Sequence, residues 1–204
     1  MALLRRGGVV AFPTETFYAL GADPRKPGAL RRLRRLKGRE PGKPLLLLAA
    51  SRAQALALAA SPPPVALRRL ARLFWPGPLT LIVPPRRPAL ARALGRPAAL
   101  AVRVTSHPLG RRLIRAYGYP LTGTSANRAG GKPPRQARAA IRSLGLRHGE
   151  CLDGGTTPGG PPSTLLDLAV RPPRLLREGA VSAVRLRSAT GTPEAGWRRK
   201  RKPA

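Results

Sequence analysis

The regular alternation of short apolar runs with stretches of helical periodicity limits this chain to few folds. Apolar runs of strand length occupy residues 9–12, 45–48, 79–83 and 100–104. Between and after them, apolar residues recur every three or four positions at 30–36, 67–74, 109–117 and 137–144. Strands interleaved with helices predict an α/β fold, a sheet flanked by helices. Many tight Pro/Gly connections favour some antiparallel pairing, so we expect an open, twisted mixed sheet.

The last quarter of the chain divides into a folded part and a tail. Apolar segments at 150–153, 164–168 and 180–186 predict three further strands. From Ser188 to Ala204 the sequence has no apolar period and ends in a basic run, which predicts a disordered basic tail. We therefore expect one domain over residues 1–187, without internal repeats, followed by a tail over 188–204.

The charge balance indicates polyanionic partners. The chain has 39 Lys and Arg against 8 Asp and Glu, for a net charge of +31. Such a surplus suits polyphosphates or nucleic acid. Biased codon composition is an alternative source of part of the arginine excess, although it does not account for so few acids. The 3 Phe, 3 Tyr and 2 Trp argue against a base-stacking platform of the single-strand-binding type.

Scarce residue types exclude several kinds of chemistry. Cys151 is the single cysteine, so an internal disulfide and a multi-cysteine zinc or iron–sulfur site are excluded. With only two histidines and eight acids, we expect no metal site built by the protein itself. The N-terminus does not resemble a secretory signal, and no apolar run has the length of a membrane span. We therefore expect a cytoplasmic protein without a membrane partner.

Polar groups gather next to several predicted strands, and each group has a simple structural alternative. Residues 13–16, Pro-Thr-Glu-Thr, follow the first strand and could bind a ligand or cap a turn. Lys37 and Arg39 end a helix, where they could flank a phosphate or stabilise the helix dipole. The small residues at 122–127 could expose amides to an anion or form an ordinary loop.

Two further polar positions sit in or beside apolar strands. Ser163 precedes the run at 164–168, and Arg177 follows Leu175-Leu176. Arg103 interrupts the strand at 100–104, where it must reach an anion, a carboxylate or solvent because a buried unpaired charge is very costly. Exposure at a sheet edge is the alternative for Arg103.

Taken in order, these segments resemble the YrdC-type threonylcarbamoyl-AMP synthases. The matching motifs are P-T-E-T-F-Y-A-L-G, K-G-R, A-V-R-V, T-S-A-N, S-T-L-L-D and L-R-E-G, spread over residues 4–186. The resemblance implies a YrdC-like fold with a concave basic face. It also implies an L-threonylcarbamoyladenylate synthase, which joins L-threonine, bicarbonate and ATP and releases pyrophosphate. Magnesium would arrive with ATP. Other proteins would then transfer the threonylcarbamoyl group to tRNA.

The resemblance also assigns roles to individual residues. The family signature is met by four residues expected to be catalytic and to bind ATP: Lys37, Arg39, Ser125 and Asn127. Arg177 and the backbone near Pro133 would also contact ATP. L-Threonine would be held by Thr14, Arg103 and Ser163.

The chain departs from the family pattern at a few positions, and two other functions compete with the first. Phe17 and Ala19 stand where the family has smaller residues or glycine, Glu40 replaces a proline, and leucines at 46–48 replace a histidine. A non-catalytic protein of the same fold could instead bind tRNA, rRNA or double-stranded RNA through its charge and basic tail. A carbamoyl-transfer domain like that of hydrogenase maturation proteins is disfavoured, because that family carries cysteine-rich zinc fingers.

Overall fold

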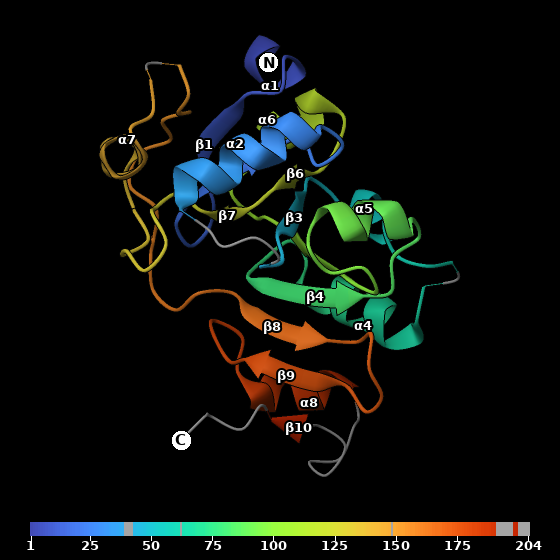
Figure 1. Cartoon of the computed structure of the whole chain (residues 1–204). Coiled ribbons are helices and arrows are strands. Elements are labelled where there is room, and N and C mark those ends of the chain that lie inside the picture. Colours follow the sequence, from blue (N-terminus) through green and yellow to red (C-terminus); the bar gives the residue numbers. More distant parts are fainter. Residues whose placement is uncertain (39–42, 62, 148, 191–197, 200–204) are drawn as a thin grey trace.

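The computed structural model describes all residues except 39–42, 62, 148, 191–197 and 200–204. Its strands form two sheets (Figure 1). The smaller sheet has the order β1-β2-β7, and the larger has the order β10-β9-β8-β4-β5-β3-β6. The strands are β1 Val9–Pro13, β2 Tyr18–Ala22, β3 Leu46–Ala49, β4 Leu79–Val83, β5 Leu100–Val104, β6 Leu121–Thr122, β7 Thr124–Ser125, β8 Thr164–Asp167, β9 Arg174–Arg177 and β10 Arg198–Arg199. The helices are α1 Ala2–Arg5, α2 Pro27–Lys37, α3 Arg52–Leu56, α4 Val65–Phe74, α5 Pro88–Ala93, α6 Pro108–Tyr117, α7 Ala137–Leu144 and α8 Ala183–Thr190.

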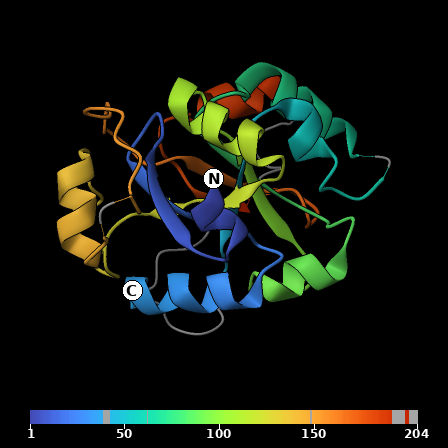
Figure 2. The same cartoon turned by 90° about the horizontal axis from the view of Figure 1, so that it is seen from above.

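The larger sheet is mixed, as the sequence predicted. β4 runs antiparallel to β5 but parallel to β8, and β3 runs parallel to β5 but antiparallel to β6. Viewed from above, α2 and α5 lie on one side of the strands, and α3, α4 and α6 lie on the other (Figure 2). All five residues of β4 are buried, which explains why its sequence is a continuous apolar run rather than an alternating one.

Two predicted strands are corrected by the structure. Of the segment expected to be a strand at 180–186, residues 183–186 belong to α8, and the Glu178 carboxylate accepts a hydrogen bond from the amide of Ala183 at 2.7 Å. This bond satisfies an amide in the first turn of the helix, which favours helix over strand there. Residues 150–153 form only an isolated bridge, between Cys151 and Ala11. In addition, the segment 18–22, for which no strand was predicted, is the strand β2.

The boundary predicted between the domain and the tail falls inside a helix. α8 continues to Thr190, so the first three residues assigned to the tail are helical. Arg198 and Arg199 form β10, which pairs in parallel with β9. The rest of the tail, at 191–197 and 200–204, lies outside the described residues. Within the part of the chain that is described, no helix combines the length and apolar character needed to cross a membrane.

Two turns of the backbone determine where the polar groups after β1 and at the end of α2 lie. β1 and β2 form an antiparallel hairpin whose connection is the segment 14–17. α2 ends at Gly38, which adopts the left-handed conformation with φ of 57°. Glycine favours that conformation, and it lets the helix end immediately after Lys37, whose side chain is buried. As a result, the segment 14–17 and Lys37 both contribute to the lining of one cavity.

Candidate active site

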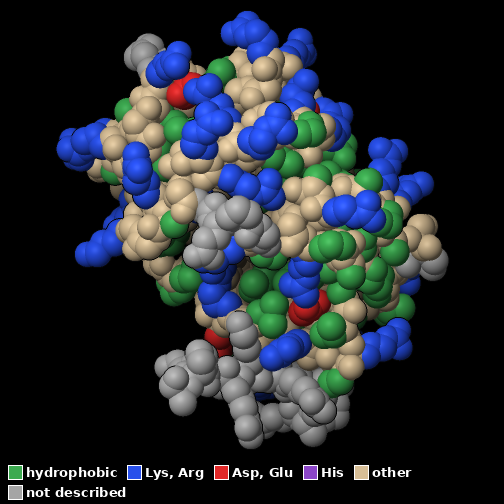
Figure 3. All heavy atoms as spheres, in the orientation of Figure 1, with side chains coloured by type: hydrophobic (Ala, Val, Ile, Leu, Met, Phe, Trp, Pro, Cys, Tyr) green, Lys and Arg blue, Asp and Glu red, His purple; other side chains and the backbone are tan. Residues whose placement is uncertain are grey.

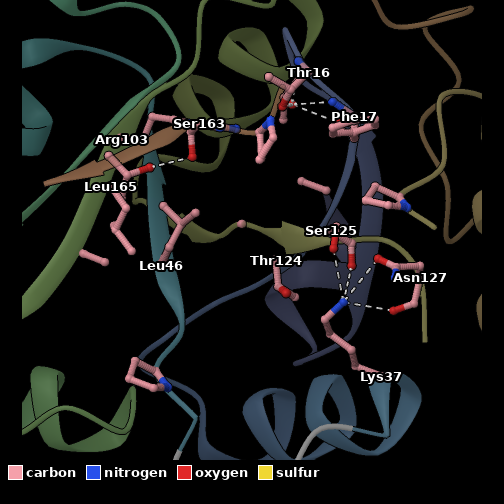
Figure 4. A pocket seen from close by; sticks show the side chains of 18 of the residues that line it. Thr16, Phe17, Lys37, Leu46, Arg103, Thr124, Ser125, Asn127, Ser163 and Leu165 are labelled. Atoms are coloured by element: carbon pink, nitrogen blue, oxygen red, sulfur yellow. Dashed lines mark hydrogen bonds between the residues drawn. The ribbon is translucent and has the colours of Figure 1, made fainter. Parts of the chain in front are cut away.

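A cavity of about 620 Å³ lies where the two sheets meet. It is bordered by the β1–β2 turn, the end of α2, strands β4 and β5, the loop after β7 and the start of β8 (Figure 4). Of the nine residues predicted to form the site, eight line this cavity: Thr14, Lys37, Arg103, Ser125, Asn127, Pro133, Ser163 and Arg177. The ninth, Arg39, lies outside the described residues, as does Glu40.

The buried ammonium of Lys37 joins α2 to the loop after β7. Lys37 Nζ donates to the backbone carbonyls of Ser125 at 2.7 Å and Asn127 at 2.9 Å. Their side-chain oxygens lie at 3.3 Å and 3.4 Å from the same nitrogen (Figure 4). Because Lys37 is only 4% exposed, its charge is little screened by water. The residues of the Lys-x-Arg and Ser-x-Asn motifs that are described thus form one cluster.

The same loop is held by a second set of bonds. The Ala129 amide donates to the Lys37 carbonyl at 2.7 Å. The side-chain amide of Asn127 donates to the carbonyls of Arg128, at 2.8 Å, and of Gly131. Asn127 therefore fixes the curvature of a loop that forms one wall of the cavity. Its amide nitrogen is used for this purpose and its Oδ1 atom faces Lys37.

The turn between β1 and β2 is built around the Thr14 hydroxyl. Thr14 Oγ1 donates to the carbonyl of Phe17 at 2.7 Å and accepts from the amides of Thr16 and Phe17, both at 3.3 Å. This pattern is a turn closed by a threonine side chain. Of the two roles considered for this segment, Thr14 closes a turn. It also lines the cavity, and its binding of a ligand stays a prediction.

Arg177 and Ser163, which also line the cavity, are joined by hydrogen bonds. Arg177 Nε and Nη2 both donate to the Ser163 carbonyl, at 3.1 Å and 2.9 Å. The Ser163 hydroxyl is 2.9 Å from that of Thr80, a buried residue of β4 that also lines the cavity. Thr80 was not predicted as a site residue, because a lone hydroxyl inside an apolar strand carries no recognisable pattern.

Arg103 is buried beside Glu15, a partner that the sequence analysis did not name. Arg103 Nε is 3.5 Å from Glu15 Oε1, and the other carboxylate oxygen accepts from Thr105 Oγ1 at 2.5 Å and the Ser106 amide at 3.1 Å. Of the three partners predicted for Arg103, an anion, a carboxylate or solvent, the structure shows the carboxylate, and burial excludes exposure at a sheet edge. Glu15 could have been chosen as that carboxylate, since it is adjacent to Thr14 in the same motif.

Several cationic side chains line the cavity. Burial lowers the pKa of Arg103, while Glu15 raises it, and burial together with the nearby Arg103 lowers the pKa of Arg177. Lys43 and Arg96 also line the cavity, and Arg96 pairs with Asp167 at 2.5 Å. Several fixed cations around one hollow favour a ligand with multiple negative charges, such as a polyphosphate.

Within the described residues, no group of three or more His, Cys, Asp or Glu side chains could hold a metal ion. Lysine and arginine are also more frequent than acids over the surface visible in Figure 3. An extended basic face for RNA stays a prediction, since a surface rich in scattered cations does not mark out one binding region.

A comparison with known families decides where the chain belongs. A family model named Sua5/YciO/YrdC, with the description "Telomere recombination", matches residues 2–179. The chain belongs to the Sua5/YciO/YrdC family. Among curated relatives, the threonylcarbamoyl-AMP synthase of Thiobacillus denitrificans is 44% identical over 168 residues, which cover 82% of this chain and 88% of that protein. The synthase of Bacillus subtilis is 38% identical over 93% of this chain, but the match covers 55% of that longer protein.

Solved structures of Sua5/YciO/YrdC proteins have the same fold. Pyrococcus abyssi Sua5 complexed with L-threonine matches with a TM-score of 0.83 and 35% identity, over 93% of this chain and 56% of that one. Escherichia coli YciO matches with a TM-score of 0.74 and 26% identity, over 91% and 89%. HypF matches at 18% identity with a TM-score of 0.70, a likeness of fold alone. The predicted YrdC-like fold class is confirmed.

Three departures from the family pattern also lie at this site. Phe17 and Ala19 line the cavity, as does Leu46 of β3. The aromatic ring of Phe17 is bulkier than the residue usual in the family, so we expect it to narrow the space for a small ligand. The effect of these substitutions on substrate choice stays a prediction.

Proposed function

We propose that this protein is an L-threonylcarbamoyladenylate synthase that condenses L-threonine, bicarbonate and ATP to threonylcarbamoyl-AMP and pyrophosphate. One observation carries the proposal: the polar residues of six separated motifs line a single cationic cavity. Membership of the Sua5/YciO/YrdC family and 38–44% identity to proteins named threonylcarbamoyl-AMP synthase support it. The threonine complex of Pyrococcus abyssi Sua5, at 35% identity, supports threonine as one substrate.

The proposed reaction needs no protein nucleophile. The threonine amine attacks the carbon of bicarbonate, and loss of water gives a carbamate. A carbamate oxygen then attacks the α-phosphorus of ATP, and the bond to the β-phosphate oxygen breaks to release pyrophosphate. The protein has to hold the reactants together and stabilise negative charge on the phosphates. A preorganised cationic cavity suits both tasks, because its cations need little reorganisation during the reaction.

In this proposal the residues divide between two substrates. Thr14, Arg103 and Ser163 hold threonine, and the guanidinium of Arg103 pairs with its carboxylate. Lys37, Arg39, Ser125, Asn127, the Pro133 backbone and Arg177 bind ATP. Each charged contact to the reacting phosphates contributes about 2–4 kcal/mol of transition-state stabilisation.

Magnesium fits this scheme as a companion of ATP rather than as a resident ion. The described residues offer no acidic or histidine cluster that could bind it, whereas phosphate oxygens are good magnesium ligands. When bound with ATP, the ion would neutralise part of the charge on the phosphates. The product would pass to proteins that transfer the threonylcarbamoyl group to tRNA, which implies a cytoplasmic setting.

The decisive experiment is mass-spectrometric detection of threonylcarbamoyl-AMP after incubation of the purified protein with ATP, L-threonine, bicarbonate and Mg²⁺. We expect the product and pyrophosphate in equal amounts, and neither when threonine or bicarbonate is left out. Pyrophosphate release that continues unchanged without threonine would reject the proposal.

A further inference from the structure

Glu15 does not itself line the cavity, but it faces Arg103, which does, and its two carboxylate oxygens are unequal. Oε2 accepts from Thr105 Oγ1 and the Ser106 amide, which fixes the carboxylate to the segment that follows β5. Oε1 is buried without a hydrogen-bond partner among the described residues, and so is Arg103 Nε, 3.5 Å away. Glu15 therefore faces Arg103 as a charge at close range rather than through a formed hydrogen bond.

The pairing with Glu15 leaves most of the Arg103 guanidinium available. Only the Nε edge faces the carboxylate, and arginine has four further N–H donors on its two terminal nitrogens. Arg103 lines the cavity while its side chain is 5% exposed. A buried guanidinium without a facing acid would be costly in free energy. Glu15 offsets that cost and leaves the terminal nitrogens for a ligand.

The other charged groups around Glu15 do not compete with Arg103. His107 lies near the same carboxylate, but burial lowers the pKa of its imidazole more than Glu15 raises it, which disfavours the charged form. The second guanidinium nearby, Arg177, is held by the carbonyl of Ser163. The negative charge of Glu15 therefore stabilises the guanidinium of Arg103.

We propose that Glu15 is a positioning residue for L-threonine binding: anchored by Thr105 and Ser106, it holds the Arg103 guanidinium charged and aimed into the cavity. This inference rests on the proposed function and on the assignment of Arg103 to the threonine carboxylate. Glu15 itself would not contact threonine. Its effect would be larger for threonine than for ATP, because the predicted ATP ligands Lys37 and Ser125 are held by a separate set of bonds.

The test is Glu15→Gln, which removes the charge but keeps an oxygen to accept from Thr105 and Ser106. The measurements are steady-state pyrophosphate release with each substrate varied and calorimetric binding of L-threonine. We expect the KM and Kd for threonine to rise roughly tenfold or more, as for a broken buried charge pair, with the KM for ATP within about twofold of wild type.

Glu150→Gln is the matched control. Glu150 is also a buried carboxylate, paired with Arg32 at 2.5 Å and accepting from the Arg147 amide at 2.9 Å. Unlike Arg103, the partner of Glu15, Arg32 does not line the cavity. It should lower thermal stability without changing the KM for threonine. If Glu15→Gln does not fold, Thr105→Val takes its place. It removes one of the two hydrogen bonds to Oε2, leaves the one from the Ser106 amide and keeps both charges, and it should raise the same KM by a smaller factor.

Several outcomes would overturn the inference. One is an unchanged or lower Kd for threonine in Glu15→Gln. Another is an equal change in the KM values for threonine and ATP. A third is an equal rise in the KM for threonine in Glu150→Gln. If Thr105→Val has to decide, an unchanged threonine KM also overturns it. Failure of the proposed function is distinct, because the wild-type protein would then form no threonylcarbamoyl-AMP at all.

Discussion

At the scale of single residues, Lys37 contributes to both the stability of the site and its charge. Its ammonium is hydrogen-bonded to two backbone carbonyls of the loop after β7, so it shapes the cavity wall. The same buried position places a positive charge where it is weakly screened. A surface lysine could provide neither effect, because its side chain would move freely and water would screen it.

Replacing Lys37 with alanine should therefore impair both stability and activity. We expect a loss of about 1–3 kcal/mol in the free energy of unfolding, because two buried carbonyls lose their donor. Pyrophosphate release should fall by roughly a hundredfold, since a charged contact worth about 2–4 kcal/mol is removed. Urea unfolding and a pyrophosphate assay check the two effects. Arg35→Ala is the control, because Arg35 is exposed on the same helix, and it should change neither. An active Lys37→Ala protein would contradict the assignment.

The residues of the site were more predictable than their contacts. Thr14, Lys37 and Ser125 stand out because hydroxyls and cations at strand and helix ends form a recognisable order. Glu15 was missed as a site residue because its partner, Arg103, is 88 residues away in the sequence and only the fold brings them together. Spacing along the chain carries no information about such a pair.

At the scale of secondary structure elements, the long periodic segments were predicted and the short ones were not. β6 and β7 have two residues each, too few to show any period. α8 was predicted as a strand because an apolar period is weak over eight residues, and the Glu178 contact that favours the helix is visible only in three dimensions. Packing between elements is the other feature that sequence periodicity does not describe.

Gly110 of α6 shows how tightly elements pack near the site. A Cβ atom there would lie 2.7 Å from the carbonyl oxygen of Pro13 and 3.5 Å from the Phe12 ring. Gly110→Ala should therefore push α6 away from the β1–β2 turn and lower the free energy of unfolding by about 1–3 kcal/mol. Urea denaturation measures this change.

Gly28→Ala is the matched control in α2. Its Cβ would meet only the end of the Arg31 side chain, at 3.9 Å, so alanine should stabilise the helix by up to about 1 kcal/mol. Equal effects of the two substitutions would show that helix propensity, rather than the contact with Pro13, decides the outcome at Gly110.

At the scale of the whole molecule, the net charge of +31 is far larger than one triphosphate site requires. Among the described residues, Arg25, Arg32, Arg96 and Arg103 pair with carboxylates, but 8 acids cannot pair with most of the 39 Lys and Arg residues of the sequence. Many of these cations are spread over the face seen in Figure 3, where they attract any polyanion without reading its sequence. Binding of RNA by this protein, which the sequence predicted as an alternative function, is thus compatible with synthesis in the cavity.

The two activities can be separated, because the cavity and the surface use different cations. We expect duplex RNA to bind at 50 mM salt and to lose at least about a hundredfold in affinity at 200 mM, since several phosphate contacts release counterions. Lys37→Ala should keep this binding while losing threonylcarbamoyl-AMP synthesis, because Lys37 is buried and cannot reach a duplex backbone. Fluorescence anisotropy at several salt concentrations measures the slope. An affinity independent of salt would argue against surface electrostatics, and loss of RNA binding in Lys37→Ala would place the RNA in the cavity itself.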